Sequence, residues 1–178
     1  NDLYVKSLYS QGYCYLKNKD YEKAIEKFKS FLNYDPQTSI LYDVYMRMGD
    51  SYFALMNYQL SVYFYDKALV FAGFEDDYAS YKKSTAYVLL KDYNSAVQSF
   101  NHLINSFSES NYIDDAIFDL GNTYILAGNF ELAYKAFSRI INHFSSSLFY
   151  AESKLKIGLV YYMQQKDNDA VDVLKNVI

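Results

Sequence analysis

The 178-residue sequence has little of what several common classes of protein require. Its one cysteine, Cys14, cannot form an internal disulfide, so cysteine usage fits a reduced cytosol and a cell envelope equally. Its 17 lysines and arginines, set against 21 acidic residues, form no basic run, which argues against nucleic acid as a partner. No apolar run approaches the roughly 20 residues of a membrane helix, so we expect no membrane span within this chain.

Signals for export are also scarce. The chain opens on NDLYVKSLY, a helical pattern with neither a basic start nor an apolar signal stretch, and we expect that a targeting segment was trimmed. Cys14 follows a tyrosine, where a lipid-attachment site would have a small residue, so a lipid anchor would have to lie upstream of residue 1. Because Cys14 has apolar neighbours in a helical pattern, we expect a buried, unreactive thiol.

The sequence has, instead, an internal repeat. One tyrosine column recurs at spacings of 37, 35, 37 and 37 residues, at Tyr15, Tyr52, Tyr87, Tyr124 and Tyr161. Small residues lie three positions before each tyrosine, at Gly12, Gly49, Ser84, Gly121 and Gly158. Others lie nine positions after it, at Ala24, Ser61, Ala96, Ala133 and Ala170. A large apolar residue follows four positions further on, at Phe28, Tyr65, Phe100, Phe137 and Leu174.

These columns predict an antiparallel helix pair in each repeat. A glycine inside a helix costs about 0.5 to 1 kcal/mol relative to alanine, so recurring glycines need a packing reason. We expect the glycine column to meet the alanine and serine column of the paired helix, with the aromatic columns beside that contact. The joints between repeats recur too: INSFSESNY (104–112) and INHFSSSLF (141–149) each end one helix in polar caps and start the next with an aromatic residue.

The columns resemble the tetratricopeptide repeat, whose pattern is a Gly, a Tyr, an Ala, a Phe and a closing Pro. This resemblance implies an all-α, right-handed superhelical solenoid of about five antiparallel helix pairs. We place a single array over residues 1–178, with repeats at about 5–38, 42–75, 77–110, 114–147 and 151–178. Only Pro36 keeps the closing proline, which Gly73, Ser108 and Ser145 replace. The fifth repeat has Asp167 where an aromatic should open its second helix and lacks a following capping helix, so we expect a fragment of a longer protein.

The repeats are longer than usual, and their joints follow the pattern (I/L)-N-x-(F/Y)-x-x-(S/T). Extended repeats with such joints resemble bacterial envelope proteins of the BamD-like outer-membrane-assembly lipoprotein and Tol–Pal coordinator types. This second resemblance implies a place in the bacterial periplasm or at the periplasmic face of the outer membrane. The cytoplasm is the alternative.

Candidate catalytic and metal-ligating residues are few and poorly spaced. His102 and His143 end second helices of different repeats, and no HxxxH, CxxC or HExxH pattern supplies ligand spacing. We interpret both as helix-end residues that interact with the helix dipole. Gly121 and Gly128 are too far apart, within helical pattern, for a phosphate-binding loop. We therefore predict no catalytic residue, no metal site, no cofactor and no enzymatic activity.

Arrays of this kind bind ligands on a concave face lined by the first helices of successive repeats. The expected groove positions are Tyr9, Tyr13, Leu16, Met46, Asp50, Phe53, Tyr81, Thr85, Phe118, Asn122, Leu155, Leu159 and Tyr162. Tyr9 and Tyr13 occupy the places where relatives that grip a C-terminal carboxylate carry Lys and Asn, which argues against that ligand. The tyrosines suit a bound peptide or helix, and the alternative is that they pack between neighbouring helices.

Acidic residues lie on the same first helices and indicate a partner with basic groups; they are Asp43, Asp50, Asp115, Asp119 and Glu152. We interpret the chain as a non-catalytic scaffold that binds a partner protein or peptide segment in a tyrosine-rich concave groove. The alternative is a helical binding protein for a small apolar ligand, of the kind associated with solute uptake.

Overall fold

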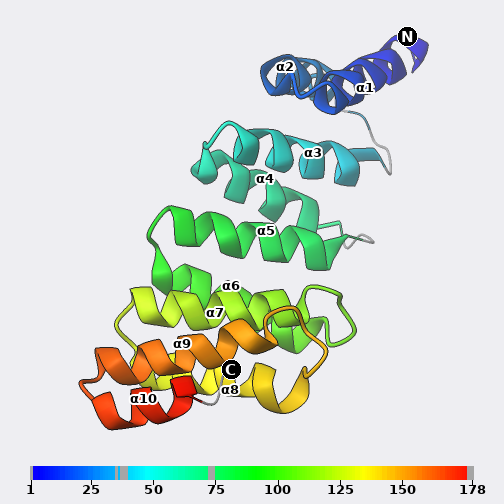
Figure 1. The fold of residues 1–178 in the computed structure, drawn as a ribbon. Coiled ribbons are helices and arrows are strands. Elements are labelled where there is room, and N and C mark those ends of the chain that lie inside the picture. Colours follow the sequence, from blue (N-terminus) through cyan, green and yellow to red (C-terminus); the bar gives the residue numbers. More distant parts are fainter. Residues whose placement is uncertain (1, 35, 37–39, 72–74, 176–178) are drawn as a thin grey trace. The chain divides into compact units, whose positions relative to one another are not determined.

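A computed structural model describes residues 2–34, 36, 40–71 and 75–175, which form helices joined by turns, with no strand among them (Figure 1). The helices are α1 (Asp2–Lys17), α2 (Tyr21–Leu32), α3 (Ile40–Ala54), α4 (Tyr58–Leu69), α5 (Asp76–Leu89), α6 (Tyr93–Ser106), α7 (Ile113–Leu126), α8 (Phe130–His143), α9 (Tyr150–Met163) and α10 (Asp167–Lys175). The predicted all-α fold class is confirmed. Gly73 and Ile178, which entered the predicted repeats, lie outside the described residues.

The chain divides into two compact units, an N-terminal unit (Asn1–Leu90) with α1 to α5 and a C-terminal unit (Lys91–Ile178) with α6 to α10. Within each unit, every helix packs on the next one along the chain, as in a helical-repeat array. None of the described helices has both the length and the apolar character needed to cross a membrane.

The turns inside the helix pairs share one backbone geometry. The residue before each N-cap position has a positive φ, at Lys19 (60°), Met56 (58°), Lys91 (60°), Gly128 (75°) and Gln165 (61°). The next residue then caps the second helix: the side chains of Asp20, Asn57 and Asp92 accept hydrogen bonds from the backbone N–H three residues on. These caps satisfy donors that a helix start leaves free, which explains the polar turns seen in the sequence.

The glycine column makes room for the side chains of the large apolar column. A Cβ added at Gly12 or Gly49 would lie 2.6 or 2.7 Å from the ring of Phe28 or Tyr65. At Gly121, the same atom would lie 2.7 Å from the ring of Phe137. The nearest side-chain atoms to these glycines are therefore ring atoms of the large apolar column, while the expected contact with the small column is confirmed at Gly49 and Ser61.

Ser61 belongs to the small column and contacts Gly49 of the glycine column. The Oγ of Ser61 donates a hydrogen bond of 3.0 Å to the carbonyl oxygen of Gly49. This bond crosses from α4 to α3 and satisfies a buried hydroxyl, so the small column serves polar contact in this pair.

The expectation that Cys14 is buried is wrong, because the thiol is exposed. The same repeat position, directly before the tyrosine column, is fully buried at Ser51, Thr123 and Val160. Those residues lie on helices that pack against the helix before them, whereas no described helix precedes α1. The exposure of Cys14 therefore identifies the face of α1 that corresponds to a joint between repeats.

Candidate protein-binding face

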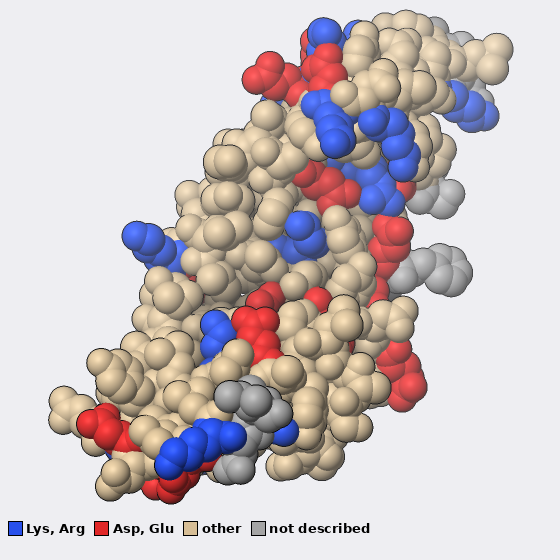
Figure 2. Space-filling model, viewed as in Figure 1, with Lys and Arg blue, Asp and Glu red and all other residues tan. Residues whose placement is uncertain are grey.

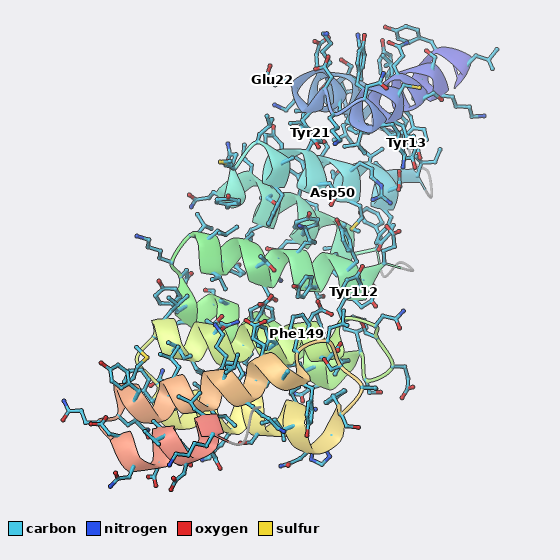
Figure 3. The ribbon with its side chains drawn as sticks, in the orientation of Figure 1. Tyr13, Tyr21, Glu22, Asp50, Tyr112 and Phe149 are labelled. Atoms are coloured by element: carbon cyan, nitrogen blue, oxygen red, sulfur yellow. The ribbon has the colours of Figure 1, made fainter. Side chains whose placement is uncertain are left out.

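The N-terminal unit carries a polar network along its first helices, centred on Arg47 of α3. The Arg47 guanidinium contacts Asp43 at 3.0 Å, Asp50 at 3.0 Å and Glu75 at 2.7 Å. Asp43 and Asp50 flank Arg47 at helical spacing, so all three side chains share one face of α3 (Asp50 is labelled in Figure 3). The Arg47 side chain is 19% exposed, so the centre of the network lies mostly below the surface but still touches solvent.

Tyrosine hydroxyls extend this network to neighbouring helices. Tyr9 on α1 donates a hydrogen bond of 2.8 Å to Asp43, while Tyr65 and Tyr78 donate bonds of 2.8 and 2.9 Å to Asp50. Burial, reinforced by the hydrogen bond and charge of Asp43, raises the pKa of Tyr9 to about 12. The pKa of Tyr65 also rises, chiefly through burial and then through the charge of Asp50. Both phenols therefore remain neutral donors at physiological pH.

Lys82 of α5 adds a second cation beside the network. Its ammonium lies 3.6 Å from the centroid of the Phe53 ring, a close cation–π contact. Burial lowers the pKa of Lys82, and the charge of Asp50 opposes that shift. The carboxylates of Asp43, Asp50 and Glu75 thus outnumber the cations Arg47 and Lys82 by one in this cluster.

Aromatic side chains border the polar network and stay partly accessible. Tyr13 lies 6.3 Å from the ring of Tyr9, and the Lys17 ammonium lies 5.1 Å from its centroid. Phe53 packs edge-on against Tyr58 with ring centroids 5.4 Å apart. Both Tyr13 and Phe53 are half-buried, so part of each side chain stays accessible. The predicted residues Tyr9, Tyr13, Asp50 and Phe53 therefore belong to one unit and to adjacent helices.

Two further predicted residues of the N-terminal unit lie on α5. Tyr81 and Thr85 are half-buried, and the Thr85 hydroxyl donates a hydrogen bond of 3.0 Å to the backbone carbonyl of Tyr81. Leu16, on α1, is half-buried and packs against the core of α1 to α4. The Thr85 hydroxyl is thus engaged within its own helix.

Met46 and Phe118 are corrections to the predicted groove, because both belong to the core. Met46 is fully buried and clusters with Tyr65. Phe118 is 6% exposed, with its ring 5.6 Å from that of Phe137 and stacked 4.5 Å from that of Phe149. The next helix along the chain covers these positions, so neither side chain can meet a partner at an open surface.

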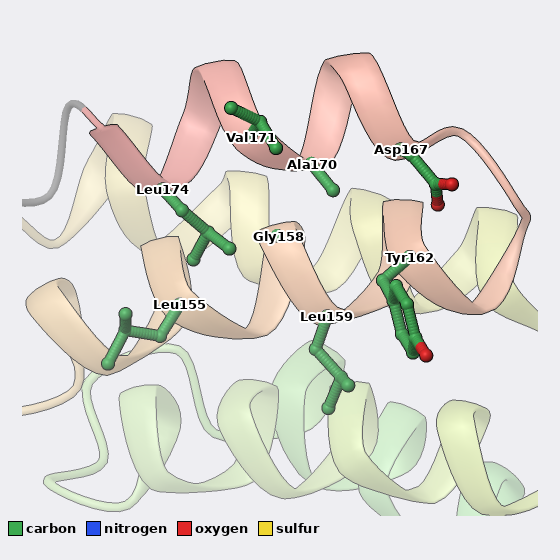
Figure 4. Close-up of a pocket in the computed structure, with 8 residues that line it drawn as sticks. All are labelled: Leu155, Gly158, Leu159, Tyr162, Asp167, Ala170, Val171 and Leu174. Atoms are coloured by element: carbon green, nitrogen blue, oxygen red, sulfur yellow. The ribbon is translucent and has the colours of Figure 1, made fainter.

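The predicted residues of the C-terminal unit fall in two places. Asn122 is half-buried on α7, while Leu155, Leu159 and Tyr162 of α9 line an open groove of about 460 Å³ (Figure 4). The other wall is α10, with side chains that sequence reasoning did not place there: Asp167, Ala170, Val171 and Leu174. We refer to this surface between α9 and α10 as the terminal groove. Among the described residues that line it, Asp167 is the charged one.

The remaining charged side chains of the described residues are spread over the surface. In the view of Figure 2, basic and acidic side chains lie in small groups with wide uncharged areas between them. Among the described residues, no group of three or more His, Cys, Asp and Glu side chains could hold a metal ion. His102 is exposed, and its Nδ1 lies 2.9 Å from the Ser106 hydroxyl one helical turn on.

Consecutive helix pairs with an aromatic surface define a helical-repeat protein of the kind that binds other proteins. One tetratricopeptide-repeat model matches residues 5–38, and another matches residues 78–110, 115–147 and 152–178. The chain therefore belongs to the tetratricopeptide-repeat family. None of the curated proteins matches the sequence significantly.

Solved structures with the same fold are distant in sequence. A crystal structure of MamA protein is 19% identical, with a TM-score of 0.81 over 97% of this chain and 89% of that one. A MamA fragment from Desulfovibrio magneticus RS-1 is 17% identical, with a TM-score of 0.77 over 97% of this chain and 92% of that one. A tetratricopeptide repeat protein from Parabacteroides merdae is 16% identical, with a TM-score of 0.73 over 97% and 78%. At these identities, the likeness shows the fold alone.

Proposed function

We propose that this tetratricopeptide-repeat scaffold holds a segment of a partner protein on the first-helix face of its N-terminal unit. The observation that carries the proposal is the combination of partly exposed rings, Tyr13 and Phe53, with an acidic network one charge in excess. Rigid aromatic side chains supply contact area at low entropic cost. The partner segment that fits is one with apolar side chains next to Lys or Arg.

Because the network has one negative charge in excess, we expect the partner to carry a basic side chain next to it. Glu75 is the most exposed carboxylate of the network, with about half of its side chain open to water. A basic side chain of the partner meets Glu75 without displacing Arg47 from Asp43 and Asp50. Because this contact stays near solvent, it adds mainly to the association rate and weakens as salt rises.

The test is affinity capture with three versions of the 178-residue chain. Tyr13→Ala with Phe53→Ala removes the accessible rings, and Tyr63→Ala removes an exposed tyrosine on α4 as the matched control. The proposal is supported if the wild type and the control retain the same protein and the double variant does not. Moderate salt should release that protein from the wild type. Equal retention by all three versions contradicts the assignment of this face.

We propose further that the scaffold acts in a bacterial envelope, in the periplasm or at the outer membrane. The support is the pair of extended joints, INSFSESNY and INHFSSSLF, that resemble envelope proteins of the outer-membrane-assembly and Tol–Pal coordinator types. Fractionation of cells of the source organism, followed with an antibody to this chain, tests it. Recovery in the periplasmic or outer-membrane fraction supports the proposal, and recovery with cytoplasmic markers contradicts it.

A small apolar ligand is the second candidate, and the terminal groove is the observation that favours it. Pockets for small ligands usually enclose most of the ligand surface. The terminal groove lies open between two helices, so a small molecule there would keep much of its surface in water. An unchanged melting temperature across a panel of apolar ligands argues against this candidate.

A further inference from the structure

The turn between α3 and α4 exposes large apolar side chains to solvent. Met56 is 75% exposed, and its neighbours Leu55 and Leu60 are 40% and 38% exposed. Surface turns usually carry polar residues, because their side chains remain in water. We refer to Leu55, Met56 and Leu60 as the apolar tip. Described helices precede α3 and follow α4 within the N-terminal unit, so the tip is open in the middle of an array.

The apolar tip lies in an uncharged part of the chain. Residues 51–65 contain no Asp, Glu, Lys or Arg. Leu89 and Leu90, which are 46% and 37% exposed, end a second uncharged segment at residues 84–90. Helices α3 and α5 run in the same direction, so the end of α5 lies on the same edge of the N-terminal unit as the tip (Figure 1). This edge therefore presents apolar side chains from two repeats.

The backbone of the tip is hydrogen-bonded within the turn. The N–H groups of Leu55, Met56 and Asn57 donate to carbonyl oxygens of α3, over 3.0, 3.0 and 2.9 Å. The side chain of Asn57 accepts a hydrogen bond of 3.2 Å from the N–H of Leu60. An unpaired backbone donor is costly in an apolar layer, so these bonds favour transfer of the tip out of water.

The turn between α1 and α2 has different chemistry. It reads KNKDYEK over residues 17–23 and carries three exposed lysines, Lys17, Lys19 and Lys23. Two acidic residues, Asp20 and Glu22, leave one positive charge in excess in this turn. Asp20 is engaged by the fold, since it caps α2 and pairs with Lys23 at 2.7 Å. The turn therefore offers lysines to an anionic surface.

The two turns lie on neighbouring repeats that pack together. Leu16, next to Lys17, packs against the same core cluster that contains Tyr52, which is close to Leu55 in the chain. Helices α1 and α3 are also in contact. One edge of the N-terminal unit thus places lysines beside an apolar tip.

We propose that this edge docks on the surface of a lipid bilayer that carries anionic headgroups. Leu55 and Met56 enter the boundary between headgroups and acyl chains, while Lys17 and Lys19 stay at the depth of the lipid phosphates. Burial of the apolar side chains supplies the main attraction, and the attraction between lysines and phosphates adds to it.

A bilayer accounts for both turns better than a protein partner does. A fluid bilayer adapts to a protruding side chain, whereas a protein needs a pocket that matches Met56 in shape. An apolar tip beside lysines also matches acyl chains that lie beneath a layer of phosphates. The contact needs neither the Tyr13 ring nor the Phe53 ring, so it is independent of the partner segment proposed above.

The experiment is flotation of the 178-residue chain with vesicles of phosphatidylcholine, prepared with and without phosphatidylglycerol. The tip variant, Leu55→Gln with Met56→Asn, removes two apolar side chains, and asparagine tolerates the φ of 58° at position 56. The control variant, Tyr34→Gln with Val70→Gln, removes side chains that are 49% and 77% exposed. Both control positions follow the far ends of α2 and α4. Circular dichroism verifies that each variant is folded.

The wild type and the control variant should float with anionic vesicles. The tip variant should bind them about tenfold more weakly, because it loses two apolar side chains that leave water on binding. A lysine variant, Lys17→Gln with Lys19→Asn, should also bind anionic vesicles about tenfold more weakly. On phosphatidylcholine alone, the lysine variant should behave as the wild type does.

The proposal is overturned if the wild type does not float with anionic vesicles, or if the tip variant floats as well as the wild type. A control variant that loses as much binding as the tip variant also overturns it. If vesicles are not bound but the tip variant fails to capture a protein that the wild type captures, the tip contacts a protein and the bilayer proposal is wrong.

Tryptophan fluorescence supplies a second readout of the same contact. The chain has no tryptophan, so Leu55→Trp adds a single reporter at the tip and Val70→Trp adds a matched one at the far end of α4. On anionic vesicles, the emission of Leu55→Trp should shift to the blue and be quenched by brominated acyl chains. The emission of Val70→Trp should stay unchanged. Equal responses at the two positions overturn the proposal.

Discussion

Helix α3 of the N-terminal unit and helix α9 of the C-terminal unit are both first helices of a repeat and carry the same repeat columns. The residues at the positions between those columns differ in their chemistry. In α3 of the N-terminal unit, Arg47 joins Asp43 and Asp50 into a network with tyrosine hydroxyls. In α9 of the C-terminal unit, Leu155 and Leu159 leave an apolar groove. The columns therefore determine how helices pack, and the positions between the columns determine what the surface can bind.

The largest expected difference in stability is between two alanine substitutions in the large apolar column. Phe137→Ala should lower the free energy of unfolding by about 3–5 kcal/mol, because Phe137 is fully buried over Gly121. Leu174→Ala should cost only about 1 kcal/mol, because Leu174 is 40% exposed at the terminal groove. Urea unfolding of both variants measures the contrast, and equal losses would show that the groove is covered in solution.

Substitutions of Gly49 and Gly158 should differ in the sign of their effect on stability as well as in its size. Gly49→Ala forces a methyl group against the buried ring of Tyr65 and should cost about 1–3 kcal/mol. Gly158→Ala meets the side chain of Leu174, which is 40% exposed and can turn away. The gain in helix propensity, about 0.5–1 kcal/mol, should then leave that variant neutral or stabilised. A Gly158→Ala loss as large as that of Gly49→Ala would contradict the packing described.

Gly128 and Met56 occupy the same turn position in the two units, so each residue can be replaced by the other. Gly128→Met should cost about 1 kcal/mol, because a residue with a Cβ is strained at the positive φ of this turn. Met56→Gly should relieve the same strain in the N-terminal unit, with a gain of roughly 0.5 kcal/mol after the added chain entropy of glycine. Thermal unfolding of the two single variants measures both effects. A shift in the same direction for both would contradict this account.

A pH dependence at alkaline pH should arise from the tyrosine network. Tyr9 keeps its proton to about pH 12 in the folded chain, whereas the phenol of an unfolded chain loses it near pH 10. Stability from this contact is therefore complete below pH 10 and is lost as pH rises towards 12. Tyr9→Phe should flatten that part of the stability curve, as measured by urea unfolding at fixed pH values. Tyr63→Phe, on an exposed ring, should leave it unchanged.

The repeat columns were enough to predict the helix pairs and the fold class, because periodic apolar residues constrain helix packing strongly. The partner of the glycine column could not be read in the same way, since spacing alone does not tell which of two nearby columns lies over it. The burial of Met46 and the exposure of Cys14 depend on whether another helix lies alongside. That information belongs to the tertiary structure.

The polar network was only partly visible in the sequence. Asp43 and Asp50 were recognised as acidic positions, but Arg47 was missed, although its spacing of four and three residues from them is a recognisable signal. Tyr65 and Tyr78 come from other helices and Glu75 from the turn before α5, so they could not be added without coordinates.

The contact between glycine and ring acts as a fixed spacer within a helix pair. It has nearly the same dimension in α1/α2, α3/α4 and α7/α8, where the missing Cβ would lie 2.6 or 2.7 Å from a ring atom. Helix pairs that share this distance between their helices can replace one another in the array. A pair could be exchanged for another, altering the exposed chemistry of the array while keeping the separation of its helices.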